Sequence, residues 1–207
     1  ATRTATFTPG RDAARKEASK LNVPRIGVRF RLPASMNQVE YFGRGPAENY
    51  LDRNAGSMIG LYKSTAEELY FPYVRPQENG HHTNTRWVSL STGKKGLLIQ
   101  ADNTIGFNAL RNSIEDFDDE EATGLPRQWS NFTPEQVANH DEAAAKNVLR
   151  RQHHINDITP RNFVEVCVDL KQQGVAGYDS WGSRPEPAYT LPANREYNWG
   201  FTLIPLK

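Results

Sequence analysis

The feature that most constrains the fold is the strict alternation of apolar and non-apolar residues over positions 25–32. Apolar side chains occupy every second position from Ile26 onward, and three arginines and a glycine fill the positions between them. Successive side chains of a strand point to opposite faces, so this pattern predicts a strand with one buried and one polar face. The face that carries the arginines has no aromatic residue, which favours a solvated sheet face over a binding stripe.

Short strand-like segments of this kind recur along the chain, each bounded by Gly, Pro, Asn or Asp. They are residues 38–42, 86–90, 96–101, 104–110, 162–170 and 197–204. Many short strands with turn signals predict an all-β protein, an antiparallel sandwich or barrel rather than a parallel α/β sheet.

One helix is predicted over residues 135–151, as a surface insertion. Thr133 fits the N-cap, Pro134 the first helical position, and Gln136 completes a capping box. The acidic run at 115–121 before it lacks the alternating ligands and glycine of a calcium loop, so we interpret it as a solvated loop.

Charge and cysteine content exclude several classes of function. The 207 residues carry 25 Lys and Arg against 24 Asp and Glu, and a net charge of +1 disfavours nucleic acid as a partner. No apolar run approaches the roughly 20 residues that span a bilayer, so no membrane role is expected. The single cysteine, Cys167, excludes an internal disulfide and is expected to be a small buried residue. The compartment stays open between cytoplasm and periplasm.

Metal and nucleophile motifs are not apparent. His81 and His82 are adjacent, as are His153 and His154, and neighbouring residues of a strand face opposite ways, so neither pair forms a natural chelate. We therefore expect no metal site and no cofactor in this chain.

Three loop clusters mix aromatic rings with amides, carboxylates and turn residues. They read FGRGPAENYLDR from Phe42, FPYVRPQENG from Phe71 and GYDSWGS from Gly177. Sugars are bound by such mixtures, because ring faces stack on their C–H groups and polar side chains bind their hydroxyls. The alternative is that these are ordered loops whose polar residues satisfy turn backbone.

The three clusters resemble, in order and spacing, motifs of the carboxy-terminal domain of β-galactosidases of glycoside hydrolase family 2. Matching residues of the first two clusters are Gly43, Gly45, Pro46, Glu48, Asn49, Tyr50, Asp52, Arg53, Glu78, Asn79, Gly80 and Arg86. The third cluster is similar to the family's G-D-D-S-W loop, with Tyr178 where the family commonly has Asp. The resemblance extends over nearly the whole chain, from Pro24 to Leu206.

The resemblance implies a galactose mutarotase-like β-supersandwich over residues 24–207, the last domain of a retaining β-galactosidase. Residues 1–23 are then a lead-in, the truncated start of the same domain. The family's catalytic Glu pair, and any Mg or Na, belong to a separate barrel, so no catalytic residue is expected here. Trp181 matches an aromatic platform for the galactoside, with Asp179 and Ser180 beside it as substrate-binding residues.

The resemblance also implies partners: the galactoside, the remaining domains of a larger chain, and further copies in a homo-oligomer. A start at Ala1 without an initiator Met is consistent with a fragment. An incomplete sandwich would expose an edge or a core face, which predicts self-association. A stand-alone carbohydrate-binding module and an aldose mutarotase remain the alternatives, and the role of residues 124–152 is open.

Overall fold

The structure is a computed structural model that describes residues 2–7, 22–74, 78–117, 155, 158–179 and 182–207. The strands are β1 (Thr2–Phe7), β2 (Arg25–Pro33), β3 (Gln38–Gly45), β4 (Met58–Thr65), β5 (His82–Ser91), β6 (Gly96–Leu110), β7 (Phe163–Gln172) and β8 (Tyr197–Leu206). Two short 3-10 turns, η1 (Ile114–Phe117) and η4 (Pro187–Tyr189), complete the described elements.

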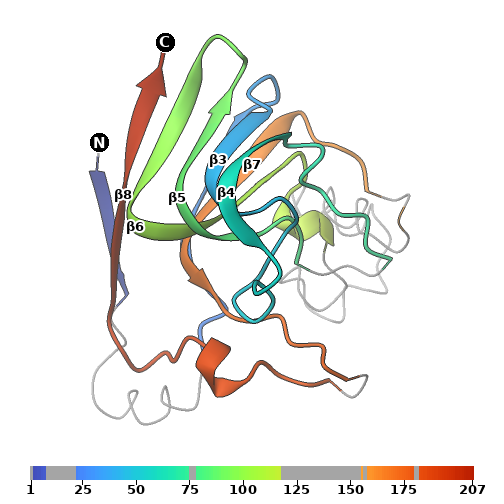
Figure 1. The fold of residues 1–207 in the computed structure, drawn as a ribbon, viewed down its shortest axis with the longest axis vertical. Helices are drawn as coiled ribbons and strands as arrows, with labels where there is room; N and C mark the ends of the chain where they lie inside the picture. Colours follow the sequence, from blue (N-terminus) through green and yellow to red (C-terminus); the bar gives the residue numbers. More distant parts are fainter. Residues whose placement is uncertain (1, 8–21, 75–77, 118–154, 156–157, 180–181) are drawn as a thin grey trace, which may run out of the picture.

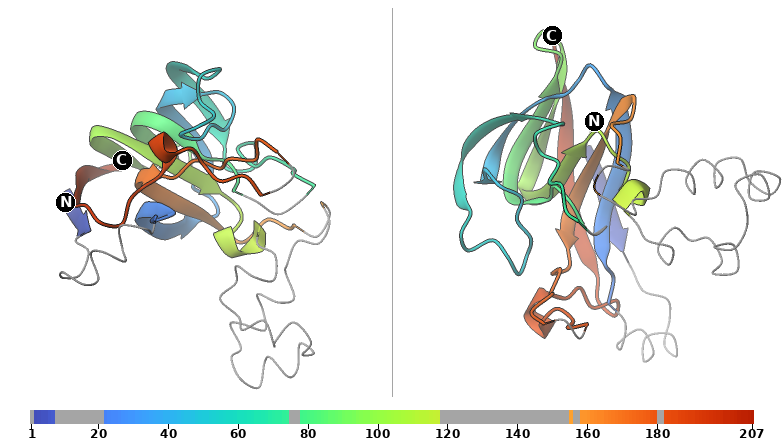
Figure 2. Two further views of the ribbon diagram at one scale, coloured as in Figure 1. Left: turned by 90° about the horizontal axis from the view of Figure 1, so that it is seen from below. Right: turned by 90° about the vertical axis from the view of Figure 1, so that its right-hand side faces the viewer.

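A single antiparallel sheet contains all eight strands, in the order β1-β8-β6-β5-β3-β4 with β2 and β7 as a branch. The branch exists because β6 is long: its first half, Gly96–Ala101, pairs with β8, and its second half, Gly106–Leu110, pairs with β7. In both views of Figure 2 the β3–β4 end and the β2–β7 branch lie on opposite sides of the molecule. The all-β, antiparallel prediction is confirmed, in agreement with a β-sandwich.

The core lies on one face of this curved sheet. Val88, Ile99 and Phe107 are completely buried, and Tyr41 packs edge-on against Phe107 with ring centroids 5.0 Å apart. The apolar face predicted for residues 25–32 is confirmed, since Val28 and its alternate neighbours pack against this core. Burial of such side chains is the main favourable term, at roughly 25 cal/mol per Å² of apolar surface.

The opposite face of β2 is not simply solvated. Glu165 of β7 accepts a hydrogen bond from Arg31 at 3.0 Å and lies 3.5 Å from Arg29, although its own side chain is 2% exposed. Glu115 of η1 pairs with Arg29 at 2.6 Å. Because a buried carboxylate requires partners, the arginines compensate charges that β7 brings beneath them. Their pairing partners were invisible in the alternation of β2 alone.

Strands β1 and β4 were missed by the sequence analysis, and two predicted strands, 96–101 and 104–110, are halves of β6. β4 was missed because Met58, Ile59 and Leu61 are exposed and Gly60 interrupts them, so no buried alternation marks it. β1 pairs with β8 and thus joins the lead-in to the same sheet. The predicted helix 135–151 and insertion 124–152 lie outside the described residues.

The acidic run begins inside the folded structure rather than in solvent. Asp116 is buried and accepts hydrogen bonds from the Ser113 amide at 2.8 Å and from Arg161 at 2.9 Å. The interpretation of the run as a solvated loop is therefore wrong for this residue. Cys167 is buried as expected, and burial raises the pKa of its thiol to about 12. No helix within the described ranges is long and apolar enough to cross a membrane.

A buried polar cluster joins β2, β6 and β7 to the segment just before β5. Arg25 lies 3.1 Å from Asp169 and donates to Asn108 at 2.9 Å. The Asn108 amide donates to the Asn79 carbonyl, so its oxygen faces His81 Nδ1 at 2.8 Å and accepts from it. Burial first, and then the charge of Arg25, lower the pKa of His81 to about 3, so this histidine is neutral.

We expect Glu165→Ala to destabilise the fold by about 2 kcal/mol. The substitution removes the acceptor of the Ile114 amide, which donates to Glu165 at 3.0 Å, and that of Arg31, and it leaves Arg29 with Glu115 alone. Glu40→Ala is the matched control, because Glu40 pairs at 3.5 Å with a largely exposed Lys63, and should cost under about 0.5 kcal/mol. Urea denaturation measures both; equal losses would contradict the role of Glu165.

Asp169 makes stability depend on pH. Burial raises its pKa to about 7, with Glu78 adding to the rise and Arg25 opposing it. The unfolded carboxyl titrates near 4, so between about pH 4 and 7 the folded state binds more protons, and the stabilisation from this group is lost as pH rises. Asp169→Asn should therefore gain stability relative to wild type as pH rises from 4 to 7, with no further change above.

Chemical denaturation of both proteins at several pH values measures this difference. His81 Nδ1 lies 3.8 Å from Asp169, so the difference reports the titration of Asp169 together with its coupling to His81. Asp102→Asn, at an exposed position of β6, is the control and should give a flat difference. A flat difference for Asp169→Asn as well would refute the assignment.

Candidate functional site

A cleft of about 440 Å³ opens where the three loop clusters meet. Its walls include residues from each cluster or its flank: Tyr50, Arg53, Glu78, Gln172, Ser183 and Arg184. In Figure 1 the segment after β7 (orange) runs along the lower end of the molecule, next to the loop that follows β3. Segments more than 100 residues apart in sequence therefore form one site.

Glu48 is the hydrogen-bonding centre of the first two clusters. Its carboxylate accepts hydrogen bonds from the Gly80 amide at 2.7 Å, from the Tyr50 hydroxyl at 3.1 Å and from the Tyr73 hydroxyl. Burial and this carboxylate raise the pKa of Tyr73 to about 12 and raise that of Tyr50 further. Both phenols consequently remain protonated donors and hold the loops together.

Asn49 connects the loop after β3 to the start of β5. Its side chain is completely buried and donates to the carbonyls of Arg44 and Ala47, both at 3.1 Å. Its oxygen accepts from the Thr83 amide at 2.9 Å and from the Thr83 hydroxyl at 2.6 Å. All of its hydrogen-bonding capacity is used inside the fold, so this motif residue has a structural role.

Asn79 and Gly80 shape the second cluster in the same way. Asn79 donates to the Phe71 carbonyl at 2.6 Å and accepts from the Phe71 amide at 2.9 Å, which closes the loop between them. Gly80 has φ +66°, and a Cβ there would lie 2.8 Å from a Leu110 methyl. Glycine is therefore required at this position by backbone conformation and by space.

Asp52 links the first cluster to the third. Its two carboxylate oxygens accept hydrogen bonds from the amides of Val175 at 3.0 Å and Ala176 at 2.8 Å, and the Tyr178 hydroxyl donates to it at 3.2 Å. Ala176 has φ +54°, an uncommon backbone conformation for a residue with a side chain, which these bonds help to hold. Asp52 thus fixes the path of the chain into the third loop.

The third loop is described only in part. Tyr178 and Asp179 are exposed, and the Tyr178 amide donates to Ser183 at 2.9 Å across the loop. Ser180 and Trp181, the other two residues predicted to contact substrate, lie outside the described residues. Tyr178 keeps a polar role through its bond to Asp52, although it replaces the family's usual acid.

Arg53 stands between two hollows. It stacks over the Tyr50 ring at 5.4 Å, lines the cleft, and also lines an adjoining hollow of about 430 Å³ with Glu48, Tyr73 and His82. Arg53 is exposed and therefore the cation most available to a ligand among the motif residues beside the cleft.

The remaining motif residues serve the frame or lie elsewhere. Gly43 lets β3 approach β5, since a Cβ there would lie 2.4 Å from Thr85 Oγ1. Gly45 is buried, and the Pro46 carbonyl accepts from the Tyr41 hydroxyl at 3.3 Å. Arg86 stacks over Phe42 at 5.2 Å on β5 and does not line the cleft.

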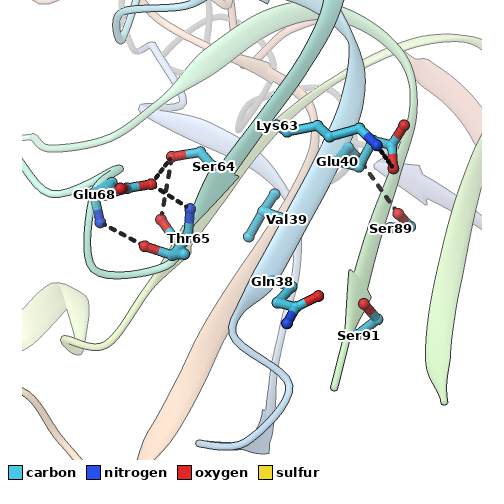
Figure 3. A pocket seen from close by; sticks show the side chains of 9 residues that line it. All are labelled: Gln38, Val39, Glu40, Lys63, Ser64, Thr65, Glu68, Ser89 and Ser91. Carbon is cyan, nitrogen blue, oxygen red and sulfur yellow. Dashed lines mark hydrogen bonds and ion pairs between the residues drawn. The ribbon is translucent and has the colours of Figure 1, made fainter. Parts of the chain in front are cut away.

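Another polar hollow, of about 430 Å³, lies over β3, β4 and β5 (Figure 3). Figure 3 shows that its polar groups largely satisfy one another: Glu68 accepts from Ser64 at 3.2 Å and from the Thr65 amide at 3.0 Å, and Lys63 pairs with Glu40. These contacts cap the turn after β4. The hollow contains no residue of the three motif clusters, so we regard the cleft as the candidate site.

Sequence reasoning missed the polar cluster that supports the cleft. Arg25 donates to Gln172, a cleft residue, at 2.6 Å and lies 3.8 Å from Glu78. The strand alternation placed Arg25 on a polar face but carried no signal of its partners. Two unusual acids within the apolar run of β7, Glu165 and Asp169, were the available signal that this face is covered.

His81 and His82 have structural partners instead of metal-binding geometry, whereas His153 and His154 lie outside the described residues. His82 lies between the carbonyls of Gly80 at 3.1 Å and Pro46 at 3.3 Å and stacks on Phe107. Within the part of the chain that the structure describes, no group of three His, Cys, Asp or Glu side chains is arranged to hold a metal ion.

Comparison with known proteins gives a consistent family. A family model described as "Beta galactosidase small chain" matches residues 4–203. A β-galactosidase of Priestia megaterium is 34% identical over 185 residues, 89% of this chain and 15% of that protein. A β-galactosidase of Arthrobacter sp. is 39% identical over 111 residues, 51% of this chain and 11% of that protein. A β-galactosidase of Streptococcus thermophilus is 28% identical over 187 residues, 89% of this chain and 15% of that protein.

The matched region is thus a small part of each relative, although it is most of this chain in two of the three. The motif residues that build the cleft fall inside the region that the family model matches. The chain belongs to the β-galactosidase small-chain family.

Proposed function

We propose that this chain is the carboxy-terminal domain of a retaining β-galactosidase and completes the pocket that binds terminal β-D-galactosides. The catalytic Glu pair would belong to a separate barrel, and any Mg or Na would be bound there as well. The length of the relatives, of which this chain spans 11–15% in the three described, supports a place among further domains of a larger protein.

The observation that carries the proposal is the attachment of the third loop to the first cluster through Asp52. A sugar-stacking side chain is effective only when its position is fixed before the ligand arrives, because ordering it on binding costs free energy. The Asp52 carboxylate accepts hydrogen bonds from two backbone amides and one hydroxyl, and these bonds fix the chain up to Ala176, three residues before Asp179.

Within the cleft, ligand groups of different kinds have suitable partners. Arg53 and Gln172 donate hydrogen bonds, whereas Glu78, whose side chain is 42% exposed, accepts them. Sugar hydroxyls require both kinds of partner. Trp181, on the same loop, is assigned the apolar face that stacks on the galactose ring, with Asp179 and Ser180 beside it.

A stand-alone carbohydrate-binding module is the alternative, and the cleft with its mixed polar lining is the observation that favours it. Titration of the 207-residue chain with galactose and lactose, followed by tryptophan fluorescence, separates the two functions. The module requires saturable quenching by the chain alone. The enzyme-domain function requires β-galactoside hydrolysis when the chain is combined with the amino-terminal remainder of its parent protein, and no hydrolysis by either part separately.

In the complemented enzyme, Trp181→Ala should lower kcat/KM for a nitrophenyl β-galactoside by about tenfold, because the stacking surface is lost. Trp87→Ala is the control: Trp87 is a half-buried tryptophan of β5 that does not line the cleft. Steady-state kinetics measure both variants. Unchanged kcat/KM in Trp181→Ala would overturn the platform role.

Asp52→Asn should release the third loop while the sheet stays intact. The amide of Val175 or that of Ala176 would then face an NH₂ group instead of an oxygen. The lost hydrogen bond lowers the local free energy of opening by about 1.5 kcal/mol, so the amides of the loop should exchange roughly tenfold faster. Hydrogen exchange read by mass spectrometry over residues 174–179 measures the effect. Asp102→Asn is the control, and unaltered exchange in Asp52→Asn would contradict the anchoring role.

A further inference from the structure

Strand β4 ends the sheet, and its outer edge has no strand partner among the described residues. It pairs with β3 over its full length, from Gln38 opposite Thr65 to Gly45 opposite Met58. The right-hand view of Figure 2 shows β4 (teal) at this margin. The backbone N–H and C=O groups along such an edge can pair with another strand.

β4 is also unusually apolar for an edge. Met58, Ile59 and Leu61 are 70%, 41% and 59% exposed, and they stand within four consecutive residues. Lys63 is the one charged residue of the strand, and it is engaged by Glu40 of β3. Natural edge strands are usually protected by charges, prolines or bulges, and the first five residues of β4 carry none of these.

The free edge of β2 gives the internal comparison. β2 carries Arg29 and Arg31, ends at Pro33, and has a register shift at Ile26 and Gly27. All three kinds of protection are present there. The contrast indicates that the exposed edge of β4 is not a general property of this sheet.

Apolar residues continue from β4 across the outward face of the sheet. Leu61 is opposite Phe42, and Phe42 is opposite Trp87, so the three side chains form one cross-strand row. Phe42 and Trp87 are half-buried and do not belong to the core cluster or to the side chains packed against it. An apolar row that ends abruptly at a free edge is completed by a strand that brings further apolar side chains.

We infer that β4 pairs antiparallel with β4 of a second copy of this chain, around a two-fold axis at Gly60. In this register Ile59 lies opposite Leu61 of the second copy, and Met58 lies opposite Tyr62. Every pair among these residues is then apolar or aromatic. Lys63 falls opposite Ser57, outside the strand, so the two lysines do not face each other.

Other registers fit less well. A shift by one residue would place outward side chains opposite core-facing ones, which the two-residue period of a strand forbids. Centring on Leu61 would place Lys63 opposite Ile59, and thus a charge opposite an apolar side chain. The Gly60-centred pairing is also isologous, so it closes as a dimer and does not extend to a fibre.

The dimer should be weak. Pairing of eight-residue strands with their flanking side chains falls in the small class of interfaces, below roughly 1,200 Å², for which micromolar dissociation constants are typical. Sedimentation velocity of the 207-residue chain over a concentration series from about 1 to 500 µM covers this range. We expect a monomer–dimer equilibrium, and a monomer throughout would overturn the proposal.

Leu61→Lys localises the contact. Two-fold symmetry removes two Ile59–Leu61 pairs at once, so the dissociation constant should rise on the order of tenfold or more. Val74→Lys, at a position that is 76% exposed outside the sheet, is the matched control and should leave it unchanged. Equal effects of both variants would assign self-association to general apolar exposure and overturn the β4 contact.

The register has its own test. An equimolar mixture of Ile59→Cys and Leu61→Cys chains should form disulfide-linked heterodimers faster than either chain alone forms homodimers, because only the mixed pair is directly opposite. The native Cys167 is buried, so it does not compete. Preferred homodimers of either variant would overturn the Gly60-centred register.

Discussion

Carboxylates and amides placed in loops, rather than strand pairing, fix the end of the sheet on which the cleft lies. The loops after β3, before β5 and after β7 have no ladder of their own, and their backbone groups need partners. Glu48, Asn49 and Asp52 supply them within five residues: Glu48 holds the loop before β5, Asn49 holds the first residues of β5, and Asp52 holds the loop after β7. The cleft exists because one short segment organises two others.

A polar interior supports this arrangement. Arg25, His81, Asn108 and Asp169 are tied together where an all-β protein usually has apolar packing. Such a cluster specifies a single arrangement more than it adds stability, because each group has few alternative partners and a high cost when left unpaired. The pKa of Asp169 is raised because burial of its carboxylate outweighs the stabilising charge of Arg25.

Much of the fold was predictable, for reasons specific to each element. The residues of β2 alternate and those of β7 form a mostly apolar run, because their side chains pack in a core. Both patterns were therefore visible in the sequence. β4 was not predictable, because its apolar residues are exposed and therefore do not show the alternation that a buried face imposes. The two halves of β6 were separated in prediction because Asp102 and Asn103 resemble a turn, whereas the structure continues the strand and changes its partner from β8 to β7.

The sequence by itself determined the strand-rich class, the apolar face of β2 and the three clusters whose residue types suit a sugar, because these depend on local periodicity and side-chain chemistry. Only the tertiary structure decided which motif residues face the cleft and which hold the frame. The side chains of Glu48 and Asn49 form hydrogen bonds with neighbouring loops. Arg86 lies over Phe42, whereas Arg53 is exposed beside the cleft. The reason is physical: a polar side chain's role follows from the partners that long-range contacts bring to it, and these partners lie up to 147 residues away, as Gln172 does from Arg25.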